Sequence, residues 1–179
     1  AAALPDQVFV PTGDGTMISG IYKGFHDLHA LGWITRIPRL VAVQPHGSAA
    51  IAAALAEGAD GYAAHHAGAA SVADSLVVRA PRCAALALRA LRASNGYAVR
   101  VTDEEILHAL VELAAQCGVF AEPAAAAAWA GLLAARHRGL IRPDETAAVL
   151  ITGTGLKDVA AAERALALCS GRHSASTHP

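Results

Sequence analysis

Two glycine-rich segments stand where a small anionic ligand could be bound. They are Thr12–Met17 and Thr152–Gly155, and each follows a short apolar run. A glycine loop that leads from a strand into a helix presents backbone amides and the positive end of the helix dipole to an anion, typically a phosphate. Glycine also lets the backbone approach that group closely. The first segment therefore predicts a phosphate site, although an ordinary strand-to-helix turn would use the same residues.

The nucleotide-binding motifs built on such loops are not matched. A dinucleotide-binding G-x-G-x-x-G motif needs glycine at position 18, which is Ile18. Gly15 and Gly20 have the spacing of a P-loop, but Ile21 and Tyr22 replace its lysine and its serine or threonine. The loop chemistry is thus that of a phosphate site outside the Rossmann and P-loop classes.

Histidines and cysteines do not form a recognisable metal site. His26 and His29 share a helix face and His65–His66 are adjacent, but neither pair has a third ligand nearby in sequence. The three cysteines are far apart, which excludes a disulfide framework and a paired-cysteine zinc site: Cys83, Cys117 and Cys169. We expect no bound metal and buried, reduced thiols.

The elements that position the loops alternate between strands and helices. The strand candidates are short, continuous apolar runs, as in strands covered on both faces: Val8–Val10, Leu40–Val43, Leu76–Val78, Tyr97–Val101 and Ala148–Ile151. Helices are expected over Met17–Leu31, over Ala49–Glu57 with Ser48 as its cap, from near Pro81, from the capping box Thr102–Glu105 to Gly118, and over Pro123–His137 and Val159–Leu168. The pattern predicts an α/β fold with a mainly parallel sheet flanked by helices.

Composition narrows the class of protein. The chain has 179 residues, 54% of them apolar, with 45 alanines and a formal net charge of −1. We expect one helix-rich α/β domain over residues 1–169 and a disordered tail over 170–179. The balanced charge argues against nucleic-acid binding, and the absence of a long apolar run argues against a membrane span. Without a signal-peptide pattern, a cytoplasmic location is expected.

Seven groups of residues, in order along the chain, carry a resemblance to a known family. They are Val10–Thr16, Gly20–Phe25, Ile37–Gln44, Ala73–Ser75, Val101–Ile106, Gly118–Pro123 and Thr152–Asp158. Together they resemble threonine synthase and its close relatives among the fold type II pyridoxal-phosphate enzymes, from Val8 to about Ala162. The family often has glycine where Thr16 stands, asparagine where Met17 stands and glycine where Ala125 stands, so individual contacts can differ.

The resemblance implies a role for each glycine loop. The residues implied to hold the phosphate of pyridoxal phosphate are Thr12, Gly13, Asp14, Gly15 and Thr16. Thr152 would place its hydroxyl against the pyridine nitrogen of the cofactor. A neutral hydroxyl leaves that nitrogen unprotonated, which moderates the electron sink. Glu122 matches a family position near the cofactor without an assigned role, and Asp74 is equally consistent with a helix cap before a strand.

Lysine is scarce, and that limits what the chain can do. Pyridoxal-phosphate catalysis starts from a lysine that holds the cofactor as a Schiff base, which the family carries upstream. The only lysines here are Lys23 and Lys157, and neither matches that position. The chain thus resembles the C-terminal half of such an enzyme, an incomplete large domain without the catalytic lysine.

The implied activity belongs to the whole protein. It is the conversion of O-phospho-L-homoserine and water to L-threonine and phosphate. The implied partners are a small amino-acid substrate, the missing N-terminal half and a second copy in a homodimer. Two alternatives stay open: a sister ammonia-lyase acting on a small amino acid, and a non-catalytic truncated product.

Overall fold

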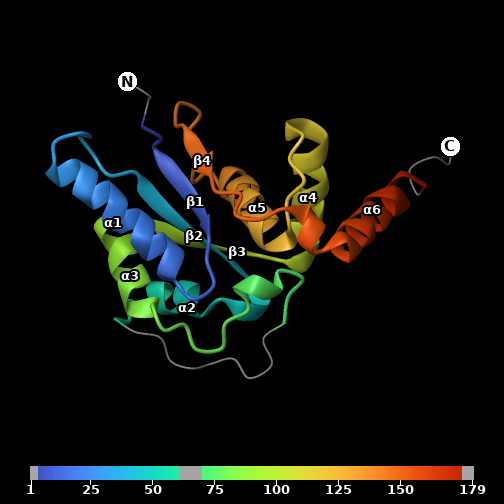
Figure 1. Cartoon of the computed structure of the whole chain (residues 1–179), viewed down its shortest axis with the longest axis horizontal. Coiled ribbons are helices and arrows are strands. Elements are labelled where there is room, and N and C mark those ends of the chain that lie inside the picture. Colours follow the sequence, from blue (N-terminus) through green and yellow to red (C-terminus); the bar gives the residue numbers. More distant parts are fainter. Residues whose placement is uncertain (1–3, 61–69, 175–179) are drawn as a thin grey trace.

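Four parallel strands form one sheet in the order β3-β2-β1-β4. The computed structural model describes residues 4–60 and 70–174. The strands are β1 (Gln7–Pro11), β2 (Arg39–Pro45), β3 (Tyr97–Val101) and β4 (Ala147–Val149). Their carboxyl ends all point to the same edge, which is the lower edge of the sheet in Figure 1. The expected α/β fold with a parallel sheet is therefore confirmed.

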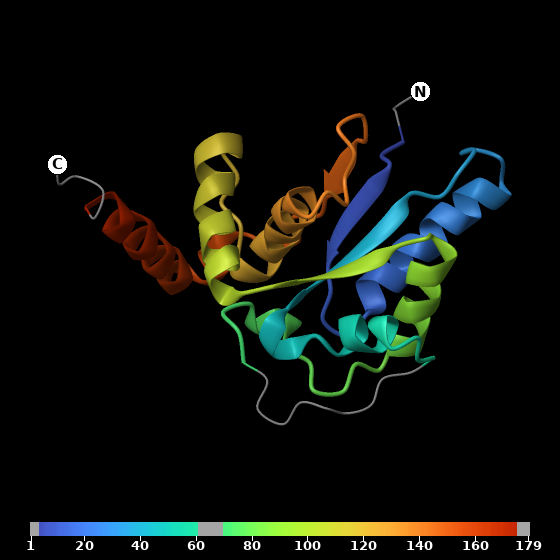
Figure 2. The same ribbon diagram turned by 180° about the vertical axis from the view of Figure 1, so that it is seen from behind.

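Helices cover both faces of this sheet, as Figures 1 and 2 show. On one face lie α1 (Thr16–Ala30), α2 (Ala50–Ala56) and α3 (Ala84–Ala93). The other face carries α4 (Asp103–Cys117) and α5 (Pro123–His137), and α6 (Val159–Ser174) packs on α4. Three short 3-10 turns complete the chain: His46–Ser48, Asp74–Leu76 and Gly155–Lys157.

Alternating strand residues build two separate cores. Val8 and Val10 point to the side of α1, α2 and α3, whereas Phe9 points to the side of α4 and α5. The same alternation continues along β2, where Leu40 and Val41 enter opposite cores. Period-2 alternation on a sheet covered on both faces gives continuous apolar strands, which is the pattern in the sequence.

Alanine lets α5 approach the sheet closely. The run Ala124–Ala128 is fully or almost fully buried, and so is Gly131 one turn later. A Cβ atom at Gly131 would lie 2.4 Å from a γ-methyl of Val43, so only glycine fits between α5 and β2 at that point. The alanine-rich composition is therefore a packing feature as well as a helix preference.

Most helix boundaries follow the sequence signals. Thr102 accepts a hydrogen bond from the amide of Glu105 while the Glu105 carboxylate accepts one from the amide of Thr102, which is the expected capping box. Gly118 ends α4 in the left-handed conformation. The last helix continues to Ser174, beyond the expected end at Leu168, so the expected tail begins within a helix.

One predicted strand is wrong. Leu76–Val78 is not part of the sheet, because Asp74–Leu76 forms a 3-10 turn. Val78 donates its backbone N–H to the hydroxyl of Ser48 at 3.0 Å, a partner that takes the place of a strand neighbour. Ser48 therefore does not cap α2 as expected, since that helix begins after Ala49 with no side-chain cap.

Four further expectations concern single features of the chain. β4 is a partly exposed edge strand, so its apolar residues are not covered on both sides as expected. The three cysteines are free thiols, and the expectation that they are buried is wrong, because Cys117 is exposed and Cys83 and Cys169 are only partly buried. Within the described ranges, no helix is both long and apolar enough to cross a membrane. His65 and His66 lie outside the described residues.

Candidate functional site

The two glycine loops begin side by side at the carboxyl edge of the sheet. β1 and β4 are direct neighbours, with Phe9 opposite Val149. The amide of Leu150 donates a hydrogen bond of 3.1 Å to the carbonyl of Phe9, which extends the pairing to the point where the second loop starts. Segments about 140 residues apart in sequence thus open onto one edge, where ligands of parallel α/β sheets bind.

The first loop surrounds a small cavity at the start of α1. This cavity of about 170 Å3 is lined by loop residues from Pro11 to Ile18 and by Ser75. No hydrogen bond within the described part of the chain uses the amides of Gly13, Asp14, Gly15 or Thr16. Free amides at a helix N-terminus are the donors that a phosphate needs.

The backbone of this loop is tightly packed at both glycines, and its geometry requires glycine at position 15. Gly15 has φ of 94°, a left-handed conformation that side chains disfavour, and its Cβ would lie 2.9 Å from the Cβ of Ala87. A Cβ at Gly13 would lie 3.2 Å from backbone atoms of Ser75 and Leu76. The loop is therefore pressed against the Asp74–Leu76 turn on one side and α3 on the other.

Thr12 anchors the loop to the sheet. Its amide donates to the carbonyl of Val43 at 2.8 Å, and its hydroxyl donates to the carbonyl of Val10 at 2.8 Å. The buried side chain of Gln44 donates to the Thr12 carbonyl and accepts from the amide of Ala52. Thr12 thus has no free donor of its own, and the donor role falls to Gly13–Thr16.

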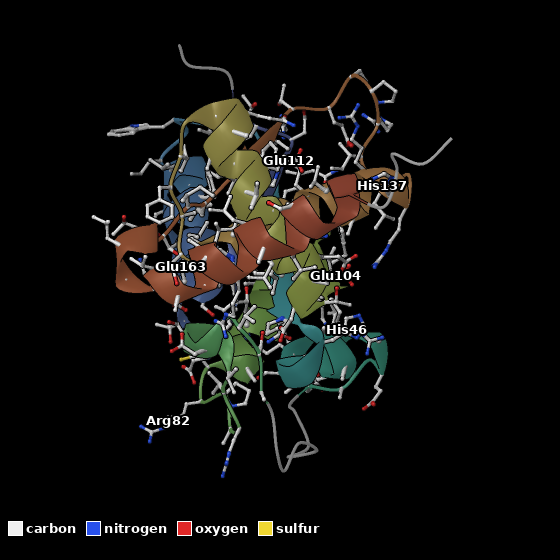
Figure 3. All side chains as sticks on the ribbon, turned by 90° about the vertical axis from the view of Figure 1, so that its right-hand side faces the viewer. His46, Arg82, Glu104, Glu112, His137 and Glu163 are labelled. Atoms are coloured by element: carbon white, nitrogen blue, oxygen red, sulfur yellow. The ribbon has the colours of Figure 1, made fainter. Side chains whose placement is uncertain are left out.

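Asp14 fixes the outer side of the loop. Its carboxylate accepts a 2.7 Å hydrogen bond from the amide of Arg82 and a 2.9 Å hydrogen bond from the hydroxyl of Thr16. The Thr16 hydroxyl also lies 3.3 Å from the sulfur of Cys83. The Arg82 side chain itself projects away from the body of the protein (Figure 3). Asp14 is therefore engaged with the chain before α3 through a backbone contact.

These bonds make the loop sensitive to acid. The Arg82 amide and then the Thr16 hydroxyl hold the pKa of Asp14 below its ordinary value of 3.8. Because the pKa of Asp14 is lower in the folded state, its ionised carboxylate stabilises the fold fully above the ordinary pKa. This contribution is lost as the pH falls through the folded-state pKa.

We expect Asp14→Asn to make the loss of stability between about pH 5 and pH 2 shallower. Urea unfolding at each pH measures this, with Glu57→Gln, at an exposed site outside the loop, as control. An unchanged slope in Asp14→Asn would contradict the expectation.

The second loop is held by the segment before α5. Glu122 donates its amide to the carbonyl of Gly153 at 3.1 Å, and Gly155 donates its amide to the carbonyl of Phe120 at 2.9 Å. The Glu122 carboxylate is nearly buried and lies 3.2 Å from the ammonium of Lys157. A Cβ at Gly153 would lie 2.0 Å from a carboxylate oxygen of Glu122, so an alanine there would require the Glu122 carboxylate to move.

Thr152 stands at the beginning of this loop with an exposed side chain. Among the residues that the structure describes, its hydroxyl has no hydrogen-bond partner. The neighbouring Glu122–Gly153 contact holds the backbone beside it in place. A fixed backbone with an available hydroxyl is what a residue needs in order to contact a ligand atom.

Sequence reasoning missed one residue of the first cavity. Ser75 lines it, although the sequence placed Ala73–Ser75 before a strand and gave the serine no role. Its amide and its hydroxyl both lie within hydrogen-bond distance of a carboxylate oxygen of Asp74. Asp74 thus stabilises its own 3-10 turn. The proximity of the turn to the loop, 60 residues away, had no signal in the local pattern.

Comparison with known proteins identifies the family. The sequence pattern of a family described as "Pyridoxal-phosphate dependent enzyme" matches residues 1–153. The chain belongs to this family.

Relatives of this chain within the pyridoxal-phosphate dependent family include threonine synthases. The threonine synthase of Methanocaldococcus jannaschii is 38% identical over 162 residues, which cover 90% of this chain and 40% of that protein. The threonine synthase of Methanosarcina acetivorans is 39% identical over 155 residues, which cover 87% of this chain and 38% of that protein. The chain therefore spans about two fifths of the length of the curated relatives it matches.

Solved structures share the fold of this family member. A fungal L-serine ammonia-lyase from Rhizomucor miehei superposes with a TM-score of 0.69 at 23% identity, covering 91% of this chain and 50% of that one. The threonine synthase of Escherichia coli superposes with a TM-score of 0.64 at 21% identity, covering 90% of this chain and 35% of that one. The fold is thus that of fold type II pyridoxal-phosphate enzymes.

The cavity of the first loop fits the phosphate of the family's cofactor. The amides of Gly13–Thr16 have no hydrogen-bond partner among the described residues, and the left-handed Gly15 lets the backbone turn at the start of α1. The second loop offers a free hydroxyl at the same edge of the sheet. The residues present are therefore compatible with pyridoxal phosphate.

Proposed function

We propose that this chain is the C-terminal part of a threonine synthase-type enzyme. The whole protein would convert O-phospho-L-homoserine and water to L-threonine and phosphate. The observation that carries the proposal is the placement of both glycine loops at the ends of the neighbouring strands β1 and β4. The threonine synthases, at 38% and 39% identity, supply the choice of reaction.

In this proposal each loop has one task. The amides of Gly13, Asp14, Gly15 and Thr16 bind the cofactor phosphate, assisted by the N-terminal end of α1. The Thr152 hydroxyl hydrogen-bonds the pyridine nitrogen, and because it is neutral it leaves that nitrogen unprotonated. The cofactor, when bound, supplies an electron sink for the substrate carbon atoms. Glu122 acts as a positioning residue that holds Gly153 and therefore Thr152.

The lysine that attaches the cofactor covalently would come from outside this chain. Lys23 lies on α1, is paired with Asp27 and is largely exposed. Lys157 is paired with Glu122 beside the second loop. We propose that a missing N-terminal half supplies the lysine and most of the contacts to a small amino-acid substrate. Exposed apolar side chains next to the second loop offer a surface for that half or for a second copy in a homodimer: Phe120, Leu156 and Val159.

The proposal predicts that this chain alone is inactive and is not specifically labelled by its cofactor. Borohydride reduction in the presence of pyridoxal phosphate, followed by peptide mapping, should give no stoichiometric adduct at Lys23 or Lys157. Phosphate release from O-phospho-L-homoserine should be absent for this chain and present for the full-length protein. Stoichiometric labelling of Lys23 together with turnover by the chain alone would contradict the proposal.

The same assay separates the alternative reactions. A sister ammonia-lyase would release ammonia from serine or threonine without releasing phosphate. An L-serine ammonia-lyase and a threonine deaminase of known structure are 23% and 24% identical to this chain, and at that identity they support the fold without favouring that reaction. A gene in which neither the same reading frame nor an adjacent one encodes the missing half would indicate the non-catalytic, truncated alternative.

A further inference from the structure

A groove of about 610 Å3 runs along the outer side of the sheet between α1 and α3. The two helices lie side by side in Figures 1 and 2. The groove adjoins the phosphate cavity, because Thr16 lines both. Its size falls within the range of small-molecule sites.

The walls of this groove are largely apolar. Tyr22 contributes from α1, and Leu86 and Ala90 contribute from α3. Leu86 is 50% exposed, which leaves a large apolar side chain facing solvent. Gly20 lines the same groove, and a Cβ there would meet nothing within 4 Å, so the space above this turn of α1 is open.

All charged side chains that line the groove are cationic. They are Lys23 and Arg89, with His26 beside them. Lys23 is neutralised by Asp27, one turn further along α1. Arg89 forms no ion pair or hydrogen bond in the parts of the chain that are described. One guanidinium is therefore available to an incoming anion, above an apolar wall.

We propose that this groove binds a small organic anion with an apolar body. The apolar part would pack on Tyr22, Leu86 and Ala90, and a carboxylate, phosphate ester or sulfonate would bind Arg89. A guanidinium without a partner favours an anionic group over a neutral one, because it forms charge-assisted hydrogen bonds with it. The site is separate from the proposed cofactor site, since that site uses the amides at the N-terminus of α1.

Fluorescence titration of the whole chain tests this with a defined probe. The probe is 8-anilinonaphthalene-1-sulfonate, an aromatic sulfonate, and the neutral N-phenyl-1-naphthylamine serves as its uncharged analogue. Saturable binding of one sulfonate probe is expected, and Arg89→Glu should weaken it about tenfold or more. The same substitution should leave binding of the neutral probe unchanged. Leu86→Ser should weaken both probes, and its exposed position lets the fold persist.

Arg100→Glu is the matched control, because Arg100 is exposed on β3 and outside the groove. Circular dichroism verifies that each variant is folded. Equal weakening by Arg89→Glu and Arg100→Glu, or no effect of Arg89→Glu and Leu86→Ser, would overturn the proposal. So would a homodimer that Leu86→Ser dissociates, since a second copy would then cover the groove. No step of the test uses pyridoxal phosphate, so its outcome is independent of the proposed function.

Discussion

Gly15→Ala should abolish phosphate binding at the first loop and destabilise the fold by about 1–3 kcal/mol. Two effects add at this position. The φ of 94° is strained for alanine, and its Cβ would lie 2.9 Å from Ala87 and 3.1 Å from the carbonyl oxygen of Cys83. Relief of either contact moves the loop away from α3 and turns the free amides away from one another.

Calorimetric titration with pyridoxal phosphate, and with inorganic phosphate as a simpler probe, measures the binding of the anion. Urea unfolding measures the stability. Gly24→Ala is the control, since Gly24 lies in α1, the helix that Gly15 precedes, and a Cβ there meets nothing within 4 Å. The control should gain up to about 1 kcal/mol, because alanine is the better helix former. Unaltered anion binding by Gly15→Ala would place the phosphate elsewhere.

The part of the fold that sequence could predict is the part fixed by local periodicity. Val8–Val10 and Leu40–Val43 are continuous apolar runs and are strands, and Thr102–Glu105 has the residues of a capping box and forms one. Leu76–Val78 has the same composition as a strand but does not pair with the sheet. Its backbone is satisfied by Ser48, a partner 30 residues away that no local pattern reveals.

The candidate site shows the same division. The glycines of Thr12–Met17 mark the loop in the sequence, because only they allow its close contacts and its left-handed turn. Two other features were not visible in the sequence. Both hydrogen-bond donors of Thr12 are engaged, by the carbonyls of Val43 and Val10, and Ser75 lines the cavity. Val43 and Ser75 belong to elements distant from the loop in sequence. The meeting of the two loops was predictable only through the resemblance to a family that binds one ligand with both.

Gly153→Ala should disturb the second loop through Glu122. The Cβ of the alanine would lie 2.0 Å from one carboxylate oxygen of Glu122 and 2.3 Å from its Cδ, so the carboxylate must move. This movement breaks the contact with Lys157. The nearly buried charge of Glu122 is then either exposed to solvent or left without its partner. We expect a loss of about 1–3 kcal/mol in the free energy of unfolding.

A double-mutant cycle isolates this cause. In a Glu122→Ala background the side chain that obstructs the alanine is absent, so Gly153→Ala should then cost less than about 0.5 kcal/mol. Urea unfolding of the four proteins gives the coupling energy directly. If Gly153→Ala costs the same in both backgrounds, Glu122 does not limit the space at Gly153. The Glu122 side chain would then have no part in shaping the second loop, and only its backbone amide would hold Gly153.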